Sequence, residues 1–264
     1  MTSNESFTPK ELKGSAALIV GGTAGIGAAT ATQLAAAGVP RIMIVGRNSE
    51  RGEATRAAVA SGNSCEVTFL AADATTVEGA ARIAAEAEKQ LGGVDILVCT
   101  TAADVQPELF ANIPTDDISR TFTQLALPSM YMASEILPHM SRRKTGVIIN
   151  VASDAGKTAT PGEAVIGAAK AAIVMFTRTL AIEAKRSGIR VNVLTPSLVN
   201  GTGSTERITS AGFSAKLFAK AATQAHLGVP ESEDIAALAV FLASPAARRL
   251  TGQAISVNGG ISAA

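Results

Sequence analysis

Several residue types that build specialised sites are scarce in this chain. Its 264 residues include no tryptophan, a single tyrosine, 3% aromatic residues and only two cysteines. Cys65 and Cys99 lie far apart in the sequence and in no metal-ligand spacing. These absences argue against a disulfide framework and against a metal site, and they fit a reducing compartment such as the cytoplasm.

Net charge and long apolar runs are also limited. The 23 Lys and Arg residues nearly balance 22 Asp and Glu residues, so nothing points to nucleic acid or an anionic membrane as a partner. The polar tail at 1–10 lacks the apolar core of a signal peptide. The longest apolar stretch, from Ala164 to Phe176, contains Lys170 and is too short to cross a bilayer. We therefore expect a soluble, cytoplasmic protein.

Short β-rich runs alternate regularly with alanine-rich helical stretches, which is typical of right-handed βαβ units. The alternation predicts an α/β fold in a single domain over residues 1–264. This domain would be a Rossmann fold, with helices on both faces of a doubly wound, seven-stranded parallel sheet. The predicted strands are 16–20, 41–45, 66–71, 96–99, 147–151, 190–194 and 254–257, and the predicted helices are 26–37, 50–60, 77–91, 116–139, 163–185 and 231–242.

One segment, from about residue 198 to 228, has no strong period and contains Gly, Ser and Thr. A connection of this length in a compact domain is usually functional or carries short helices of its own. We interpret it as a mobile substrate lid. Phe213, Leu217 and Phe218 stand at helical spacing, which fits either an apolar wall of the substrate site or a plain amphipathic helix.

A glycine-rich loop, GGTAGIG at residues 21–27, follows the first predicted strand and precedes an alanine-rich helix. Glycines permit a tight turn and let backbone N–H groups approach a pyrophosphate at the helix N-terminus. The loop therefore predicts dinucleotide binding. Its expected cofactor contacts are Gly22, Thr23, Gly25, Ile26 and Gly27.

The end of the second strand indicates which cofactor is preferred. NAD enzymes usually place Asp or Glu here to bind the ribose 2′-hydroxyl, and Gly46 cannot do so. Arg47 offers a guanidinium suited to a 2′-phosphate, so we predict NADP(H), with Arg47 and Asn48 as contacts. The alternative is that Arg47 only solvates a helix start. Asp73, after the third strand, would by itself be interpreted as a turn or cap residue.

Five segments together resemble the short-chain dehydrogenase/reductase family over nearly the whole chain. They are GGTAGIG at 21–27, DILV at 95–98, GVIINVASDAG at 146–156, GIRVNVLTPS at 188–197 and LTGQAISVNGG at 250–260. The resemblance implies a nicotinamide cofactor, contacted also by Asp73, Pro196 and Thr202, and hydride exchange between a carbonyl and an alcohol. Because relatives pair their long helices into dimers and tetramers, we expect a homotetramer or dimer. Intrachain packing of these helices is the alternative.

The resemblance also locates the catalytic residues, and one of them is missing. In this family a serine binds the substrate oxygen and a tyrosine protonates it. A lysine four residues after the tyrosine lowers the tyrosine pKa and holds the nicotinamide ribose. Ser153 matches the serine and Lys170 matches the lysine, but the tyrosine position is Ile166. The family's N-N-A-G after the fourth strand is also changed, to C-T-T-A at 99–102.

Several residues could replace the missing acid. Glu163 lies one turn before Ile166, and a carboxyl in an apolar pocket can stay protonated near neutral pH. The simpler interpretation is that Glu163 caps a helix. Lys170 could also donate through water or the ribose hydroxyl. Tyr131, the single tyrosine, fits the core or an interface better, and both histidines, His139 and His226, fit structural roles.

Three functions remain open. The first is an NADP(H)-dependent oxidoreductase that reduces an activated small-molecule carbonyl without the tyrosine. The second is a cofactor-binding, catalytically silent protein. The third is a non-redox lyase or isomerase on the same scaffold, using Ser153 and Glu163.

Overall fold

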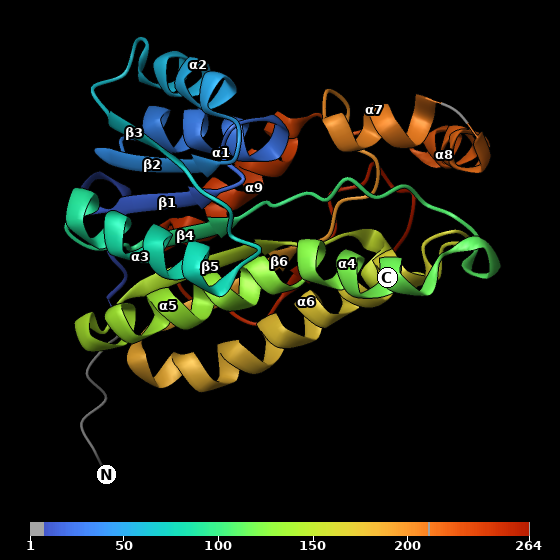
Figure 1. The fold of residues 1–264 in the computed structure, drawn as a ribbon. Coiled ribbons are helices and arrows are strands. Elements are labelled where there is room, and N and C mark those ends of the chain that lie inside the picture. Colours follow the sequence, from blue (N-terminus) through green and yellow to red (C-terminus); the bar gives the residue numbers. More distant parts are fainter. Residues whose placement is uncertain (1–7, 211, 264) are drawn as a thin grey trace.

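Seven parallel strands form one sheet in the computed structural model, which describes residues 8–210 and 212–263 (Figure 1). Their order, β3-β2-β1-β4-β5-β6-β7, reverses direction between β1 and β4. This confirms the predicted doubly wound Rossmann sheet. The strands are β1 (Ala16–Val20), β2 (Arg41–Gly46), β3 (Glu66–Ala71), β4 (Ile96–Cys99), β5 (Gly146–Val151), β6 (Ile189–Leu194) and β7 (Ala254–Ile255).

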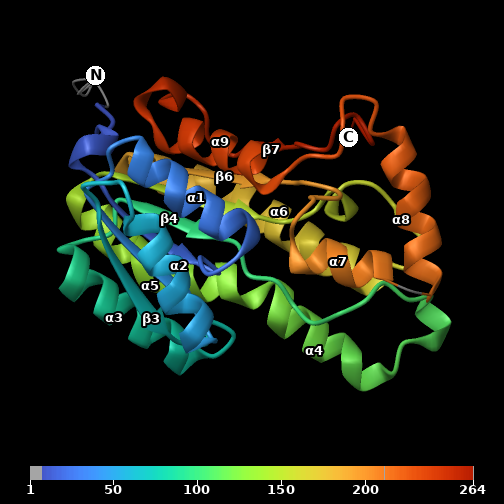
Figure 2. The ribbon, with the colours of Figure 1, turned by 90° about the horizontal axis from the view of Figure 1, so that it is seen from above.

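Helices cover both faces of the sheet because successive strand residues point to opposite sides. In β1, Leu18 and Val20 join one apolar core, whereas Ala17 and Ile19 join the other. The helices α3, α5 and α6 pack on the first core, and α1, α2 and α9 pack on the second (Figures 1 and 2). Their bounds are α1 (Gly25–Ala36), α2 (Ser49–Ala60), α3 (Val77–Leu91), α4 (Thr115–Leu125), α5 (Leu127–Arg143), α6 (Ala164–Ala184), α7 (Gly203–Ser210), α8 (Gly212–Gln224) and α9 (Ser232–Ala243).

Short 3-10 turns complete the described elements, and the N-terminal one is anchored to the sheet. Just before it, the Lys10 ammonium lies 2.7 Å from the Asp95 carboxylate at the start of β4. Residues 1–7 of the predicted polar tail lie outside the described residues. The turns are η1 (Leu12–Gly14), η2 (Phe110–Asn112), η3 (Asp154–Gly156), η4 (Lys185–Ser187) and η5 (Pro245–Ala247).

The single helix predicted over 116–139 is instead two helices, α4 and α5, which meet at Ala126. Pro128, near the start of α5, has no backbone N–H, and its ring would crowd the carbonyl of Gln124 in a continuous helix. The break directs the end of α4 toward the carboxyl edge of the sheet. There Gln124 and Leu125 line the cavity described below.

The predicted lid is helical for much of its length, because it contains α7 and α8. Figure 2 shows both helices beyond the carboxyl ends of the strands. Leu217 and Phe218 line the cavity, whereas Phe213 is 40% exposed and packs on Gly162. Two of the three apolar side chains therefore form a wall. The mobility of this segment stays a prediction.

The longest helix, α6, is a core helix of the domain. With the turn after it, the stretch Ala164–Ser187 is long and apolar enough to cross a membrane by length and composition alone. However, α6 packs along β6 and buries Ile173, Leu180 and Ala181. Its apolar character is explained by this burial.

Candidate active site

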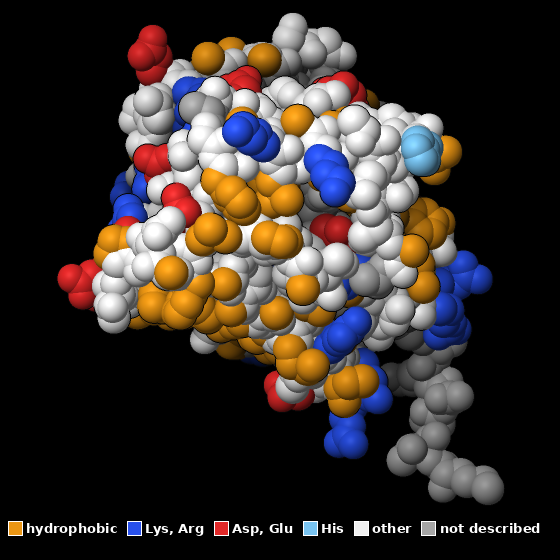
Figure 3. Space-filling model, turned by 90° about the vertical axis from the view of Figure 1, so that its right-hand side faces the viewer, with side chains coloured by type: hydrophobic (Ala, Val, Ile, Leu, Met, Phe, Trp, Pro, Cys, Tyr) orange, Lys and Arg blue, Asp and Glu red, His pale blue; other side chains and the backbone are white. Residues whose placement is uncertain are grey.

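A cavity of about 830 Å³ opens at the carboxyl ends of the strands. It extends from the glycine-rich loop and the end of β2, past the ends of β4 and β5, to α6 and the lid helices. Figure 3 looks onto this face of the molecule, where hydrophobic side chains gather among scattered charged ones. The position at the strand-order reversal is where ligands bind in open α/β sheets.

The glycine-rich loop has the close packing that the sequence predicts. Gly21 has a φ of +85°, and a Cβ there would lie 2.8 Å from the backbone of Thr100. Gly27 lies so close to the carbonyl of Gly21 that a side chain would not fit. The Thr100 hydroxyl lies 3.1 Å from the carbonyl oxygens of Val20 and Gly21 and donates to them. The threonine that follows β4 thus holds the loop in place, and the loop's N–H groups at the start of α1 are available to a phosphate.

The end of β2 forms a second, basic part of the cavity. A side chain at Gly46 would collide with Thr23, whose hydroxyl oxygen lies 2.6 Å from the Cβ position, so an acidic residue would not fit there. Arg47 and Arg51 both line the cavity. Asn48 is used differently: its side chain accepts a hydrogen bond from the Arg51 N–H at 2.8 Å and caps α2.

Four residues from β5 and α6 meet at the opposite part of the cavity. Ser153 follows β5, and its hydroxyl oxygen accepts from the Ala155 N–H at 3.2 Å, which leaves the hydroxyl proton for a ligand. Glu163, Ile166 and Lys170 are three and four residues apart, so they share one face of the start of α6. This face lines the cavity. We call these four residues the reaction end.

Glu163 occupies the N-cap position of α6, but its side chain makes no capping hydrogen bond. The side chain lines the cavity instead. Burial raises the pKa of Glu163 to about 7, with Lys170 opposing the rise and the neighbouring Asp154 adding to it. The carboxyl is therefore substantially protonated near neutral pH.

Lys170 is almost fully buried, at 8% exposure. Burial lowers the pKa of Lys170 to about 8, and the charge of Glu163 opposes this fall. The two groups attract each other without forming an ion pair within 4 Å among the described residues. Below about pH 7 the pair is an ammonium and a neutral carboxylic acid.

The other predicted proton-donor candidates lie elsewhere. Tyr131 packs against the core on α5. The Nδ1 atom of His139 on α5 lies 3.2 Å from a carboxylate oxygen of Glu88 on α3. His226 is exposed in the turn after α8. All three positions agree with the structural interpretation made from the sequence.

The structure brings most of the predicted cofactor residues into the cavity wall. Gly22 lies beside the wall, packed on Ile44, and Asn48 caps α2. Among the wall residues that the sequence analysis did not predict are two arginines, Arg51 and Arg207. Arg51 stands four residues after Arg47, a helical spacing that could have revealed it; nothing in the sequence marks Arg207. The predicted residues that line the cavity are Thr23, Gly25, Ile26, Gly27, Arg47, Asp73, Ser153, Glu163, Ile166, Lys170, Pro196 and Thr202.

The loop, the helix start and the cavity at the strand-order reversal together define a dinucleotide-binding Rossmann protein. Comparison with known proteins narrows this class. A family model described as enoyl-(acyl carrier protein) reductase matches residues 21–262. The chain is 32% identical over 254 residues to the 3-oxoacyl-(acyl-carrier-protein) reductase of Haemophilus influenzae, covering 95% of this chain and 99% of that protein. It is 30% identical over 253 residues to the 7alpha-hydroxysteroid dehydrogenase of Bacteroides fragilis, covering 92% and 93%.

Solved structures give the same result. A short-chain type dehydrogenase/reductase from Mycobacterium ulcerans superposes with a TM-score of 0.87 at 26% identity, covering 96% of this chain and 91% of that one. A 7 alpha-hydroxysteroid dehydrogenase complexed with NADH and 7-oxo glycochenodeoxycholic acid superposes with a TM-score of 0.86 at 25% identity, covering 98% of both. The chain belongs to the short-chain dehydrogenase/reductase family.

Proposed function

We propose that this protein is an NADP(H)-dependent reductase of an activated carbonyl, in which Glu163 supplies the proton that a tyrosine supplies in relatives. The observation that carries the proposal is the reaction end. There a free serine hydroxyl, a carboxyl with a pKa near 7 and a buried lysine line one cavity with the glycine-rich loop. Bound NADPH would supply the hydride.

Each reaction-end residue has a distinct role in this mechanism. The Ser153 hydroxyl donates to the carbonyl oxygen and orients it. The neutral Glu163 carboxyl gives its proton to that oxygen as the alcohol forms, and the carboxylate then regains a proton from water. Lys170 holds the nicotinamide ribose, and its ammonium stabilises the Glu163 carboxylate after the transfer. Ile166 contributes only an apolar wall.

The preference for NADP(H) rests on the basic end of the cavity. Arg47 and Arg51 line it without an acidic neighbour at position 46, where Thr23 leaves no room for one. Two guanidinium groups suit a 2′-phosphate, which accepts charge-assisted hydrogen bonds. One solved relative contains NADH, so the preference has to be measured for this chain.

The restriction to an activated carbonyl follows from magnitudes. A positioned general acid raises the rate about 10²–10⁴-fold, which lowers the barrier by about 3–6 kcal/mol. Proximity of the reactants lowers it by about 7–11 kcal/mol, which is the larger effect. A diketone or a quinone-like ring needs less help from the acid than a simple ketone. A carboxyl one turn away from the usual position therefore suffices for such substrates.

Ile166 supports a second candidate, a cofactor-binding protein without catalysis, because this side chain has no proton to give. The two candidates are separated by NADPH consumption with a panel containing diketones, a quinone and a simple ketone, comparing the wild type with Ile166→Tyr. Turnover by the wild type, lost in Lys170→Met, supports the reductase. Turnover by Ile166→Tyr but not by the wild type supports the cofactor-binding protein without catalysis.

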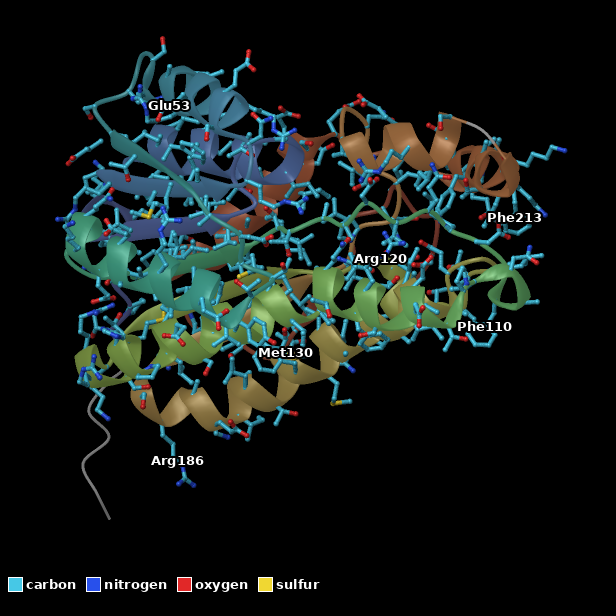
Figure 4. All side chains as sticks on the ribbon, in the orientation of Figure 1. Glu53, Phe110, Arg120, Met130, Arg186 and Phe213 are labelled. Atoms are coloured by element: carbon cyan, nitrogen blue, oxygen red, sulfur yellow. The ribbon has the colours of Figure 1, made fainter. Side chains whose placement is uncertain are left out.

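Two further expectations belong to this proposal. We infer a homotetramer or dimer formed through α5 and α6, since Met175 and Ile182 on α6 are 59% and 61% exposed. In Figure 4, Met130 marks α5 beside this helix. A cytoplasmic location is inferred from the unpaired, buried cysteines.

A further inference from the structure

A single arginine on the lid reaches across the cavity. Arg207, on α7, donates from Nη2 to the carbonyl oxygen of Ala103 at 3.1 Å. Ala103 belongs to the segment that leaves β4, which Figure 1 shows running beneath α7. The same nitrogen lies 3.5 Å from the Ser204 hydroxyl at the start of α7. The guanidinium therefore lies between the lid and the carboxyl end of β4, in the cavity wall.

The charge of this guanidinium is poorly compensated. Its Nε lies 3.5 Å from the Asp104 carboxylate, but the Asp104 side chain is 85% exposed to water. An ion pair with so exposed a partner is weak because water screens it. The Nε atom itself is buried and lacks a hydrogen-bond partner among the described residues, although the Arg207 side chain as a whole is 36% exposed. A buried guanidinium N–H without an acceptor favours an anionic ligand at this place.

The start of α7 lies against the glycine-rich loop. A Cβ added at Gly25, the first residue of α1, would lie only 3.1 Å from the Thr202 side chain. Arg207 folds back toward the same end of α7, since its Nη1 would lie 3.6 Å from a Cβ at Gly203. The guanidinium therefore lies beside Gly203, the neighbour of the residue, Thr202, that contacts the glycine-rich loop. The anion expected beside that loop is a pyrophosphate.

We propose that Arg207 binds the pyrophosphate of the cofactor from the lid side, opposite the N–H groups of the glycine-rich loop. This inference rests on the proposed dinucleotide cofactor. Arg207 then fastens α7 over the bound dinucleotide. Asp104 is only a weak competitor for the guanidinium, because its exposed carboxylate is screened by water.

The test is a fluorescence titration of full-length wild type, Arg207→Gln and Asp104→Asn with NADPH, with NADP⁺ and adenosine 2′-monophosphate measured by competition. Loss of charge-assisted hydrogen bonds in Arg207→Gln should raise the Kd of NADPH and NADP⁺ about 10-fold to 100-fold. Adenosine 2′-monophosphate has no pyrophosphate, so its Kd should stay within about 2-fold. Asp104→Asn should bind NADPH as tightly as the wild type or more tightly.

Contrary results point to specific errors. If Arg207→Gln binds NADPH like the wild type, Arg207 does not contact the pyrophosphate. If Asp104→Asn weakens NADPH as much as Arg207→Gln does, Arg207 is only a latch between α7 and the β4 segment. If the wild type binds neither NADPH nor NADH, the proposed function fails, which is a separate outcome. Arg207→Lys, which keeps the charge, and a thermal unfolding curve for each variant exclude misfolding as the cause.

Discussion

The two ends of the cavity are built on different principles. At the cofactor end, formed by the glycine-rich loop and the end of β2, the groups that we propose for the pyrophosphate are mainly backbone N–H groups, held in place by glycines that contact Thr100 and by the N-terminus of α1. Arginine side chains supplement them. At the reaction end, the chemistry depends on individual side chains of β5 and α6. The glycine-rich loop keeps the spacing that the family resemblance implies, whereas Ile166 stands where that resemblance implies a tyrosine. A backbone site tolerates side-chain change, but a side-chain site changes its chemistry with one residue.

The largest expected effect concerns the residue shared by both ends. Lys170→Met should lower kcat about 10³-fold or more, since the ammonium that holds the ribose and stabilises the Glu163 carboxylate is removed. The melting temperature should stay equal or rise, because a buried charge with a lowered pKa is replaced by an apolar side chain. Steady-state kinetics and calorimetry measure both. A melting temperature that falls together with the activity would mean that Lys170 is structural.

A tyrosine should rescue the reaction end only where the carboxyl acid is absent. In the wild-type background, Ile166→Tyr should raise kcat less than about 10-fold, since Glu163 already provides a general acid. In a Glu163→Gln background, the same change should raise kcat about 10²-fold or more. The four variants form a double-mutant cycle. Equal gains in both backgrounds would show that Glu163 and the tyrosine position act independently.

Removing an arginine from the cofactor end should change the preference between NADPH and NADH, and should leave the catalytic step unchanged. Arg51→Gln should raise the Kd of NADPH about 10-fold to 100-fold, since charge-assisted hydrogen bonds to the 2′-phosphate are lost. The Kd of NADH should change less than about 2-fold. Arg56→Gln is the matched control on α2, since Arg56 pairs with Glu53. The assignment would be wrong if both cofactors weakened equally.

The smallest expected effect concerns a residue beside the acid. Asp154 raises the pKa of Glu163, and its Oδ1 accepts from the Ser262 hydroxyl at 2.7 Å. Asp154→Asn keeps this acceptor but removes the charge, so the pKa of Glu163 should fall. The pH at which the reduction rate is halved should move to a lower value while the low-pH rate is kept. An unchanged pH profile would show that Asp154 does not influence the pKa of the proton donor.

The sequence was sufficient to predict the architecture. The strands β1, β3 and β4 and helix α3 have the predicted bounds, because apolar runs and helical periods record burial directly. The sequence analysis did not predict the break between α4 and α5 at Ala126, although Pro128 indicates it. The two lid helices were not delimited, because their apolar residues are few and their period is weak.

The candidate site was predicted less completely, for physical reasons. Ser153, Lys170 and Ile166 stand at motif spacings and were located without a structure. Glu163 was interpreted chiefly as a cap, since an acidic residue at a helix start normally serves as one. Only the structure shows that its side chain lines the cavity and makes no capping bond. Arg207 could not be found, because its importance depends on a contact with Ala103, far away in the sequence.

The role of Glu163 as proton donor can be measured through the pH dependence of kcat/KM for reduction of an activated ketone by NADPH. Glu163→Gln is compared with the wild type and with Glu183→Gln, an exposed position on the same helix. Because burial raises the pKa of Glu163 to about 7, the acid form is present below that pH and is lost above it. The wild type and Glu183→Gln should therefore be fastest below about pH 7 and decline above it, and Glu163→Gln should be about 10²-fold slower at low pH, without that decline. A Glu163→Gln variant with the rate and pH profile of the wild type would show that Glu163 is not the proton donor.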